Sequence, residues 1–92
     1  MKIAIASLGE KIDSEISDVA GRAPFYQIFE NGELIETIKN PFRFGGGGAG
    51  TSVAKMLSDK RVKKFVAGKI GPNVEAFFKE KEIKIEAKKG KV

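Results

Sequence analysis

Residues 25–39 read FYQIFENGELIETIK and carry the clearest structural signal in the chain. Two runs rich in aromatic and β-branched residues, 24–30 and 33–39, flank the dipeptide Asn31-Gly32. Asn-Gly between two such runs is typical of a two-residue type I′ hairpin turn. In the second run apolar and polar side chains also alternate, which is the period of a strand. The stretch therefore predicts two antiparallel strands.

The segments on either side of this hairpin predict three more strands and two helices. Residues 2–7 (KIAIAS) predict a strand that is apolar on both faces, whereas the polar residues 10–23 predict a loop. After Asn40-Pro41, which ends the second hairpin strand, either Thr51 or Ser52 can cap a helix with apolar residues at 53, 56 and 57. Residues 62–67 predict the next strand.

The last third of the chain predicts a second βαβ unit. Gly71-Pro72-Asn73 open a helix, since proline is tolerated at the first helical position, and residues 83–87 form the final strand. The element order β-β-β-α-β-α-β indicates an α/β fold in which the later strands are parallel and joined by right-handed crossovers.

Length and composition limit the class of protein. Ninety-two residues are enough for one domain, which we place at residues 1–87, followed by a Lys-rich flexible tail at residues 88–92. The chain has no cysteine and no histidine, which excludes disulfides, thiolate catalysis, the usual zinc sites and a Ser-His-Asp triad. No apolar run is long enough to span a membrane, and no signal-peptide pattern is present, so we expect a cytoplasmic protein.

Charge is distributed unevenly along the chain. Residues 1–59 carry 6 basic and 8 acidic side chains, whereas residues 60–92 carry 11 basic and 4 acidic ones. One interpretation is a solvated surface with a Lys-rich end. The other is a half of the molecule that faces an anion, such as nucleic acid, an anionic cofactor or an acidic partner.

Four glycine-bearing segments are predicted to meet at one edge of the sheet. They are the end of the first strand, the entry to the second strand, the glycine run before the first helix and the loop before the second helix. Ligands of open α/β sheets bind at such an edge, where backbone N–H groups at helix N-termini favour anions. The candidate ligand-binding residues are Ser7, Gly9, Gly21, Arg22, Gly45, Gly46, Gly47, Gly48, Gly50, Thr51, Gly68, Gly71 and Asn73.

These residues match no complete catalytic motif. A Walker-A loop would need lysine where Thr51 stands, and the glycine run lacks the acidic residue of a dinucleotide site. A tight loop without a ligand, and a surface role for Arg22, are the plain alternatives. A metal-dependent nuclease would need acidic residues on the first strand, where residues 2–7 have none. We do not expect nucleic acid as a partner, because the chain has no recognised binding motif.

Four motifs resemble a known family. Residues 21–26 (GRAPFY), Asn40-Pro41, residues 46–50 (GGGAG) and residues 66–73 (VAGKIGPN) are similar, in this order, to motifs of the dinitrogenase iron-molybdenum cofactor biosynthesis family. This family includes the NifX and NafY carriers and the C-terminal domain of NifB. The resemblance implies a ribonuclease-H-like domain with a mixed five-stranded sheet of order 3-2-1-4-5, in which strand 2 is antiparallel.

The resemblance also implies non-enzymatic binding or carriage of the iron-molybdenum cofactor or a related iron–sulfur precursor cluster. Family members often carry histidine just before the Gly-Arg pair, where this chain has Val19-Ala20. Ligation of a cluster by soft side chains is therefore excluded, and an anionic cluster would be held through Arg22 and the glycine-loop amides. The alternative is an interaction or regulatory module of the same fold that binds a protein partner or another small anion.

A further expectation concerns how well the second face of the sheet is covered. If both crossovers run in the same direction, both helices cover one face. The other face also carries apolar residues, and residues 10–22 supply only Ile12, Ile16, Val19 and Ala20 to cover it. We therefore expect incomplete cover there, and a contact with a second copy or another protein.

Overall fold

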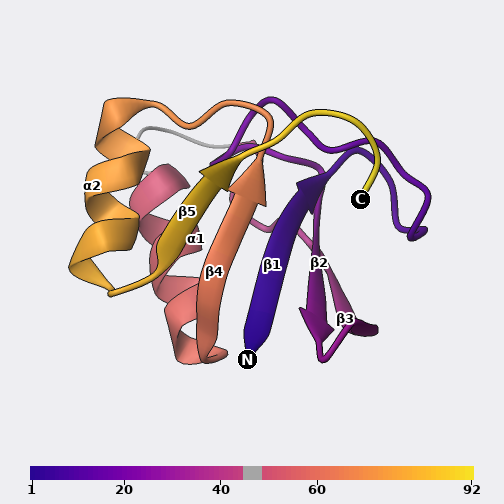
Figure 1. Cartoon of the computed structure of the whole chain (residues 1–92). Coiled ribbons are helices and arrows are strands. Elements are labelled where there is room, and N and C mark those ends of the chain that lie inside the picture. Colours follow the sequence, from indigo (N-terminus) through magenta and orange to yellow (C-terminus); the bar gives the residue numbers. More distant parts are fainter. Residues whose placement is uncertain (45–48) are drawn as a thin grey trace.

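The computed structural model describes residues 1–44 and 49–92. Its elements are β1 (Lys2–Ser7), β2 (Phe25–Glu30), β3 (Glu33–Lys39), α1 (Ala49–Asp59), β4 (Val62–Ala67), α2 (Pro72–Glu80) and β5 (Lys84–Ala87). They form a single open sheet with two helices (Figure 1). No helix in these two ranges is long and apolar enough to cross a membrane.

The sheet has the order β3-β2-β1-β4-β5, as predicted. β2 is antiparallel to both β1 and β3, while β4 is parallel to β1 and β5 is parallel to β4. Asn31 and Gly32 have φ angles of 53° and 80°, which a type I′ turn requires at both central positions. The hairpin prediction from residues 25–39 is therefore confirmed.

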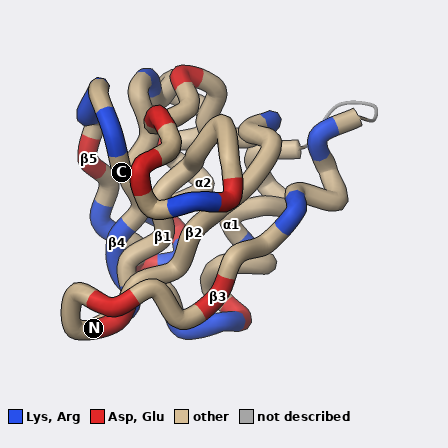
Figure 2. The backbone as a smooth tube through the Cα atoms, turned by 90° about the vertical axis from the view of Figure 1, so that its right-hand side faces the viewer, with Lys and Arg blue, Asp and Glu red and all other residues tan. Residues whose placement is uncertain are grey.

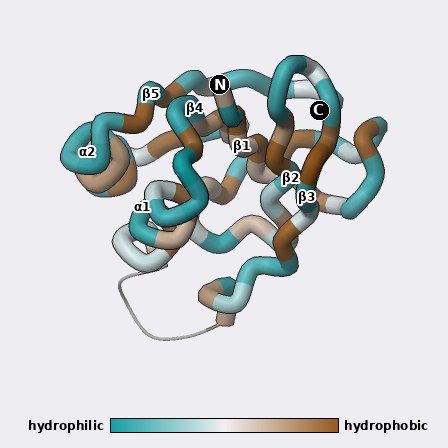
Figure 3. Tube along the Cα trace, turned by 90° about the horizontal axis from the view of Figure 1, so that it is seen from below, coloured by the Kyte–Doolittle hydropathy of each residue, from teal (hydrophilic) through white to brown (hydrophobic). Residues whose placement is uncertain are grey.

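Both helices lie on one face of the sheet, as expected from right-handed crossovers (Figure 3). The core fills the space between them and the sheet. Ala4 and Ala6 of β1 are fully buried there, beside the large side chains of Tyr26 and Phe65. The ring of Phe78 from α2 stacks on Phe65, with ring centroids 4.4 Å apart. The alanines of β1 leave the room that these aromatic rings occupy.

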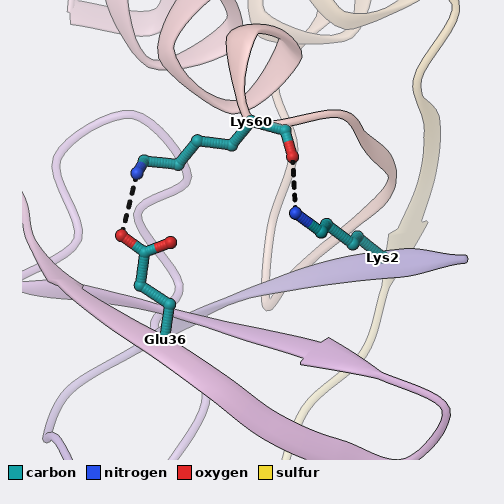
Figure 4. A network of polar contacts seen from close by, with 3 residues as sticks. All are labelled: Lys2, Glu36 and Lys60. Carbon is teal, nitrogen blue, oxygen red and sulfur yellow. Dashed lines mark hydrogen bonds and ion pairs between the residues drawn. The ribbon is translucent and has the colours of Figure 1, made fainter.

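Lys60, just after α1, joins the end of this helix to the lower end of the sheet (Figure 4). Its Nζ lies 2.8 Å from Oε2 of Glu36 on β3, and its carbonyl accepts a hydrogen bond from Nζ of Lys2 on β1 at 3.3 Å. Both side chains of the ion pair are more than a third exposed, so the pair adds little stability.

Two predicted boundaries need correction. α1 begins at Ala49, so Thr51 and Ser52 lie inside the helix and cannot cap it. The final strand begins at Lys84 rather than residue 83, because the Ile83 N–H bonds back to the carbonyl of Phe78 and closes the end of α2. The other helix start is as predicted: Gly71 is the N-cap of α2 and Pro72 is its first residue.

The second face of the sheet is covered only in part. Residues 8–16 fold over its upper end, where the Leu8 N–H bonds to the carbonyl of Glu15 and the side chain of Gln27 bonds to the carbonyl of Lys11. The end of the chain lies against the same segment, because Glu15 and Lys91 form a β-bridge. The predicted division into a domain of residues 1–87 and a flexible tail stays a prediction.

A hollow of about 380 Å³ remains on this face. Apolar side chains dominate its lining: Ile3, Ile5, Ile12, Phe29 and Val92, with Asn31 and Gly32 at its lower end. Ile12 is 60% exposed, so the 8–16 segment leaves one of its own apolar side chains in solvent.

Candidate functional site

A cavity of about 540 Å³ lies where α1 and α2 begin, at the edge of the sheet expected to bind a ligand. Three segments surround it: the loop before β2, the start of α1, and the β4–α2 loop with the first turns of α2. The lining residues are Asp18, Val19, Ala20, Gly21, Arg22, Ala49, Gly50, Lys69, Gly71, Asn73, Val74 and Phe77.

The cavity combines cationic groups with an apolar wall. Arg22 and Lys69 bring two positive charges, and Val74 and Phe77 of α2 form the apolar side. Gly71, Asn73 and Val74 line the cavity and no side chain caps α2 at Gly71, so the positive end of the helix dipole lies at the cavity, although Pro72 itself has no N–H. This arrangement suits an anion that also has a nonpolar surface.

Arg22 also ties two segments together. Its guanidinium donates a hydrogen bond to the backbone carbonyl of Arg43 at 3.1 Å. The segment that leads into the glycine run is thereby held next to the cavity, and the Arg43 guanidinium stacks 4.9 Å from the ring of Phe44.

A buried amide fixes the loop that carries Arg22. The side-chain N–H₂ of Asn40 donates to the carbonyls of Gly21 at 3.2 Å and Ala23 at 2.9 Å, while its oxygen accepts from the Phe42 N–H at 2.8 Å. The hydroxyl of Tyr26 donates to the carbonyl of Ala20. Both side chains are buried, and burial raises the pKa of Tyr26 well above its ordinary value. The backbone on both sides of Arg22 is therefore positioned from the core.

Two glycines allow the walls of the cavity to approach closely. A Cβ added at Gly21 would lie 3.2 Å from backbone atoms of Gly50 in α1. A Cβ at Gly50 would lie 3.1 Å from Cγ2 of Val74 in α2. A Cβ at either position would be crowded, so glycine lets the loop before β2, α1 and α2 approach one another closely.

Asp18 is an acidic residue at this otherwise cationic edge. Its side chain packs against Gly68, where an added Cβ would lie 2.0 Å from the Asp18 carboxylate. The Gly68 N–H bonds to the carbonyl of Ser17 at 2.7 Å, so the 17–18 segment is held against the end of β4.

The structure brings together only part of the predicted site. Gly21, Arg22, Gly50, Gly71 and Asn73 line the cavity. Gly68 lies behind Asp18, and Thr51 is an exposed residue of α1 that does not line the cavity. Gly45, Gly46, Gly47 and Gly48 lie outside the described residues. The ligand-binding role of all these residues stays a prediction.

Ser7 and Gly9 belong to a different cluster. The Ser7 hydroxyl is buried and donates to the carbonyl of Gly9 at 2.7 Å. The buried amide of Gln27 donates to that same carbonyl and to the carbonyl of Lys11. These groups therefore stabilise the 8–16 loop instead of lining the cavity.

Sequence reasoning missed Asp18, Lys69 and the apolar wall of Val74 and Phe77. Lys69 lies inside the 66–73 motif, so it could have been included. Phe77 and Val74 have the spacing of core residues, and only the close approach of α1 and α2 assigns them to a cavity. Within the described residues, no group of three or more His, Cys, Asp or Glu residues could hold a metal ion.

The family model for dinitrogenase iron-molybdenum cofactor proteins matches residues 1–92. The chain belongs to this family. No sequence among the curated proteins matches it.

Solved structures share the fold of this family member. The apo form of the orange protein from Desulfovibrio gigas superposes with a TM-score of 0.84 at 22% identity, over 91% of this chain and 72% of the other. A Thermotoga protein described as a NifB candidate has a TM-score of 0.80 at 28% identity, over 99% of this chain and 79% of the other. A dinitrogenase candidate from Methanocaldococcus jannaschii has a TM-score of 0.64 at 20% identity, over 100% of this chain and 79% of the other.

Proposed function

We propose that this protein is a non-enzymatic carrier of an anionic metal cluster, either the iron-molybdenum cofactor or a precursor of it. The cargo would bind in the cavity between the loop before β2 and the starts of α1 and α2. The observation that carries the proposal is the convergence of Arg22, Lys69 and the uncapped start of α2 on one cavity with an apolar wall. Family membership supports the choice of cargo.

The donor set determines how the cargo would be held. The chain has no cysteine or histidine, so no thiolate or imidazole can ligate iron. Arg22, Lys69 and the backbone N–H groups at the start of α2 would instead bind the outer surface of the anion by charge and hydrogen bonds. Phe77 and Val74 would contact its less polar part. Such a carrier would release its cargo without breaking a metal–protein bond.

The direct test is anaerobic titration with isolated iron-molybdenum cofactor. We expect the metals to co-elute with the protein in gel filtration. The variants Arg22→Ala and Lys69→Ala should each bind more weakly, because a desolvated charge-assisted contact contributes about 1.5–3 kcal/mol, or roughly a 10- to 100-fold change in affinity.

Lys55→Ala is the matched control, since Lys55 is an exposed lysine of α1 that pairs with Asp59 and does not line the cavity. If both cavity variants bind the cofactor as tightly as the parent, the cofactor does not bind in this cavity. Thermal denaturation of each variant distinguishes lost binding from lost folding.

A second candidate function is an interaction or regulatory module that binds a protein partner or another small anion. The hollow on the second face of the sheet favours it, because half-buried Ile3, Ile5 and Phe29 surround that hollow beside the exposed Ile12. A second copy of the chain is the simplest occupant. If citrate or phosphate binds with the same dependence on Arg22 and Lys69, and the cofactor does not, the small-anion function is favoured.

A further inference from the structure

β5 forms one edge of the sheet, and in the described part of the chain it pairs with β4 alone. Its register with β4 is regular from Lys84 to Ala87. The Lys88 N–H bonds to the carbonyl of Ala67. Since N–H and C=O groups of a parallel strand alternate in direction, the backbone groups of Ile85 and Ala87 point away from β4. These groups are available to a further strand.

The opposite edge strand is protected in a different way. The register between β2 and β3 shifts between Ile28 and Phe29, which leaves Ile35 as an extra residue of a β-bulge. Bulges disrupt pairing with another chain. β5 has no bulge and no proline, and the feature that discourages unwanted pairing there is its lysines.

The charge beside β5 is strongly positive. Residues 84–88 carry two exposed lysines, Lys84 and Lys88, and one glutamate, and Lys89 and Lys91 follow on the segment that leads to the β-bridge with Glu15. The glutamate, Glu86, is ion-paired with Lys64 of β4 at 2.6 Å, and this pairing lowers its pKa. In Figure 2, blue Lys and Arg positions lie next to β5. The lysines repel another basic strand and attract an acidic one.

A groove runs beside the edge on the helix side. It has a volume of about 460 Å³ and is lined by Lys79, Glu82, Ile83, Lys84 and Ile85. Ile85 is half-buried against the core, so the groove has an apolar floor with charged residues around it. The groove lies at the end of α2, away from the cavity at its start.

We propose that β5 is a docking edge for an extended segment of a partner protein in which apolar and acidic residues alternate. The segment would add a sixth strand by pairing with the backbone of Ile85 and Ala87. Its apolar side chains would enter the groove beside Ile83 and Ile85, and its acidic side chains would face Lys84 and Lys88. A partner docked here leaves the candidate cargo cavity open.

A labelled peptide of alternating valine and glutamate tests this inference by fluorescence anisotropy at low salt. We expect saturable binding that weakens as salt is added. A peptide of alternating valine and lysine should not bind. The valine–glutamate peptide with alternate nitrogens methylated should lose at least about ten-fold in affinity, because it cannot pair with the strand backbone.

Two variants locate the site on β5. Lys84→Glu should weaken peptide binding roughly five-fold or more, whereas Lys39→Glu, the matched reversal on the opposite edge strand, should leave it unchanged. Ala87→Pro removes an outward N–H without affecting the β4 ladder, so it should weaken binding and keep the melting temperature. Absence of binding, equal binding of the methylated or basic peptide, or equal effects of the two lysine reversals would overturn the proposal.

Discussion

At the scale of single residues, Asn40 determines the position of Arg22 from within the core. Asn40→Asp keeps the acceptor for the Phe42 N–H but loses the donor to the carbonyls of Gly21 and Ala23. We expect a loss of about 1–3 kcal/mol in the free energy of unfolding, since buried carbonyls lose their partner. Urea denaturation measures this loss, with Thr37→Ala on exposed β3 as the control. An Asp variant as stable as the parent would show that the amide is unimportant.

Because of Tyr26, the free energy of unfolding is expected to depend on pH in the alkaline range. Burial raises the pKa of its hydroxyl above the ordinary value of 10.0. Its protonated form is therefore favoured in the folded state, and the stability it contributes is complete below pH 10 and falls as the pH rises further. Tyr26→Phe should flatten the decrease in unfolding free energy between about pH 10 and pH 11 relative to the parent. Identical slopes in parent and variant denaturation curves would contradict this.

At the scale of elements, the β4–α2 loop contains two glycines that differ in the space around them: Gly68 has no room for a side chain and Gly71 has. A Cβ at Gly68 would collide with Asp18, whose Cα lies 3.0 Å away, whereas a Cβ at Gly71 meets nothing within 4 Å. Gly68→Ala should therefore displace the 17–18 segment and cost about 1–3 kcal/mol, and Gly71→Ala should change stability little. Thermal denaturation of the two variants compares them directly, and equal melting temperatures would contradict the expected difference.

The elements themselves followed from local sequence patterns, with informative exceptions. The Asn31-Gly32 turn and Pro72 at the start of α2 act within a few residues, so their strands and helix could be predicted. The start of α1 could not be predicted in this way, because Ala49 and Gly50 resemble the glycine run before them. They are helical because they pack against α2 and the loop before β2. For the same reason Thr51 was mistaken for a cap.

At the scale of the whole molecule, topology accounts for the part of the site that sequence predicted. The strand directions place the loops with Arg22 and Gly71 at the same edge, and both do line the cavity. Ser7 is at that edge too, but its side chain faces the 8–16 loop and bonds to Gly9. Which face a side chain takes, and which helix residue borders a cavity, depends on tertiary packing that one sequence does not reveal.

The incompletely covered face of the sheet leads to a prediction about the whole particle. Ile12 is 60% exposed beside the hollow that Ile3, Ile5 and Phe29 line, and burying this apolar surface favours association. We expect sedimentation to show reversible self-association at micromolar concentration, because one face of so small a domain gives an interface at the lower end of the usual size range.

Ile12→Glu should abolish this association and preserve the fold, since it places a charge in the contact and leaves the core unchanged. Val19→Glu is the matched control, because Val19 is similarly exposed, at 52%, but lines the cargo cavity rather than the hollow. If the association depended on Val19 and not on Ile12, the contact would lie at the cavity, and cargo and second copy would compete for one surface. A parent chain that sediments as a monomer throughout would mean that the 8–16 segment and the end of the chain already shield the hollow sufficiently from water.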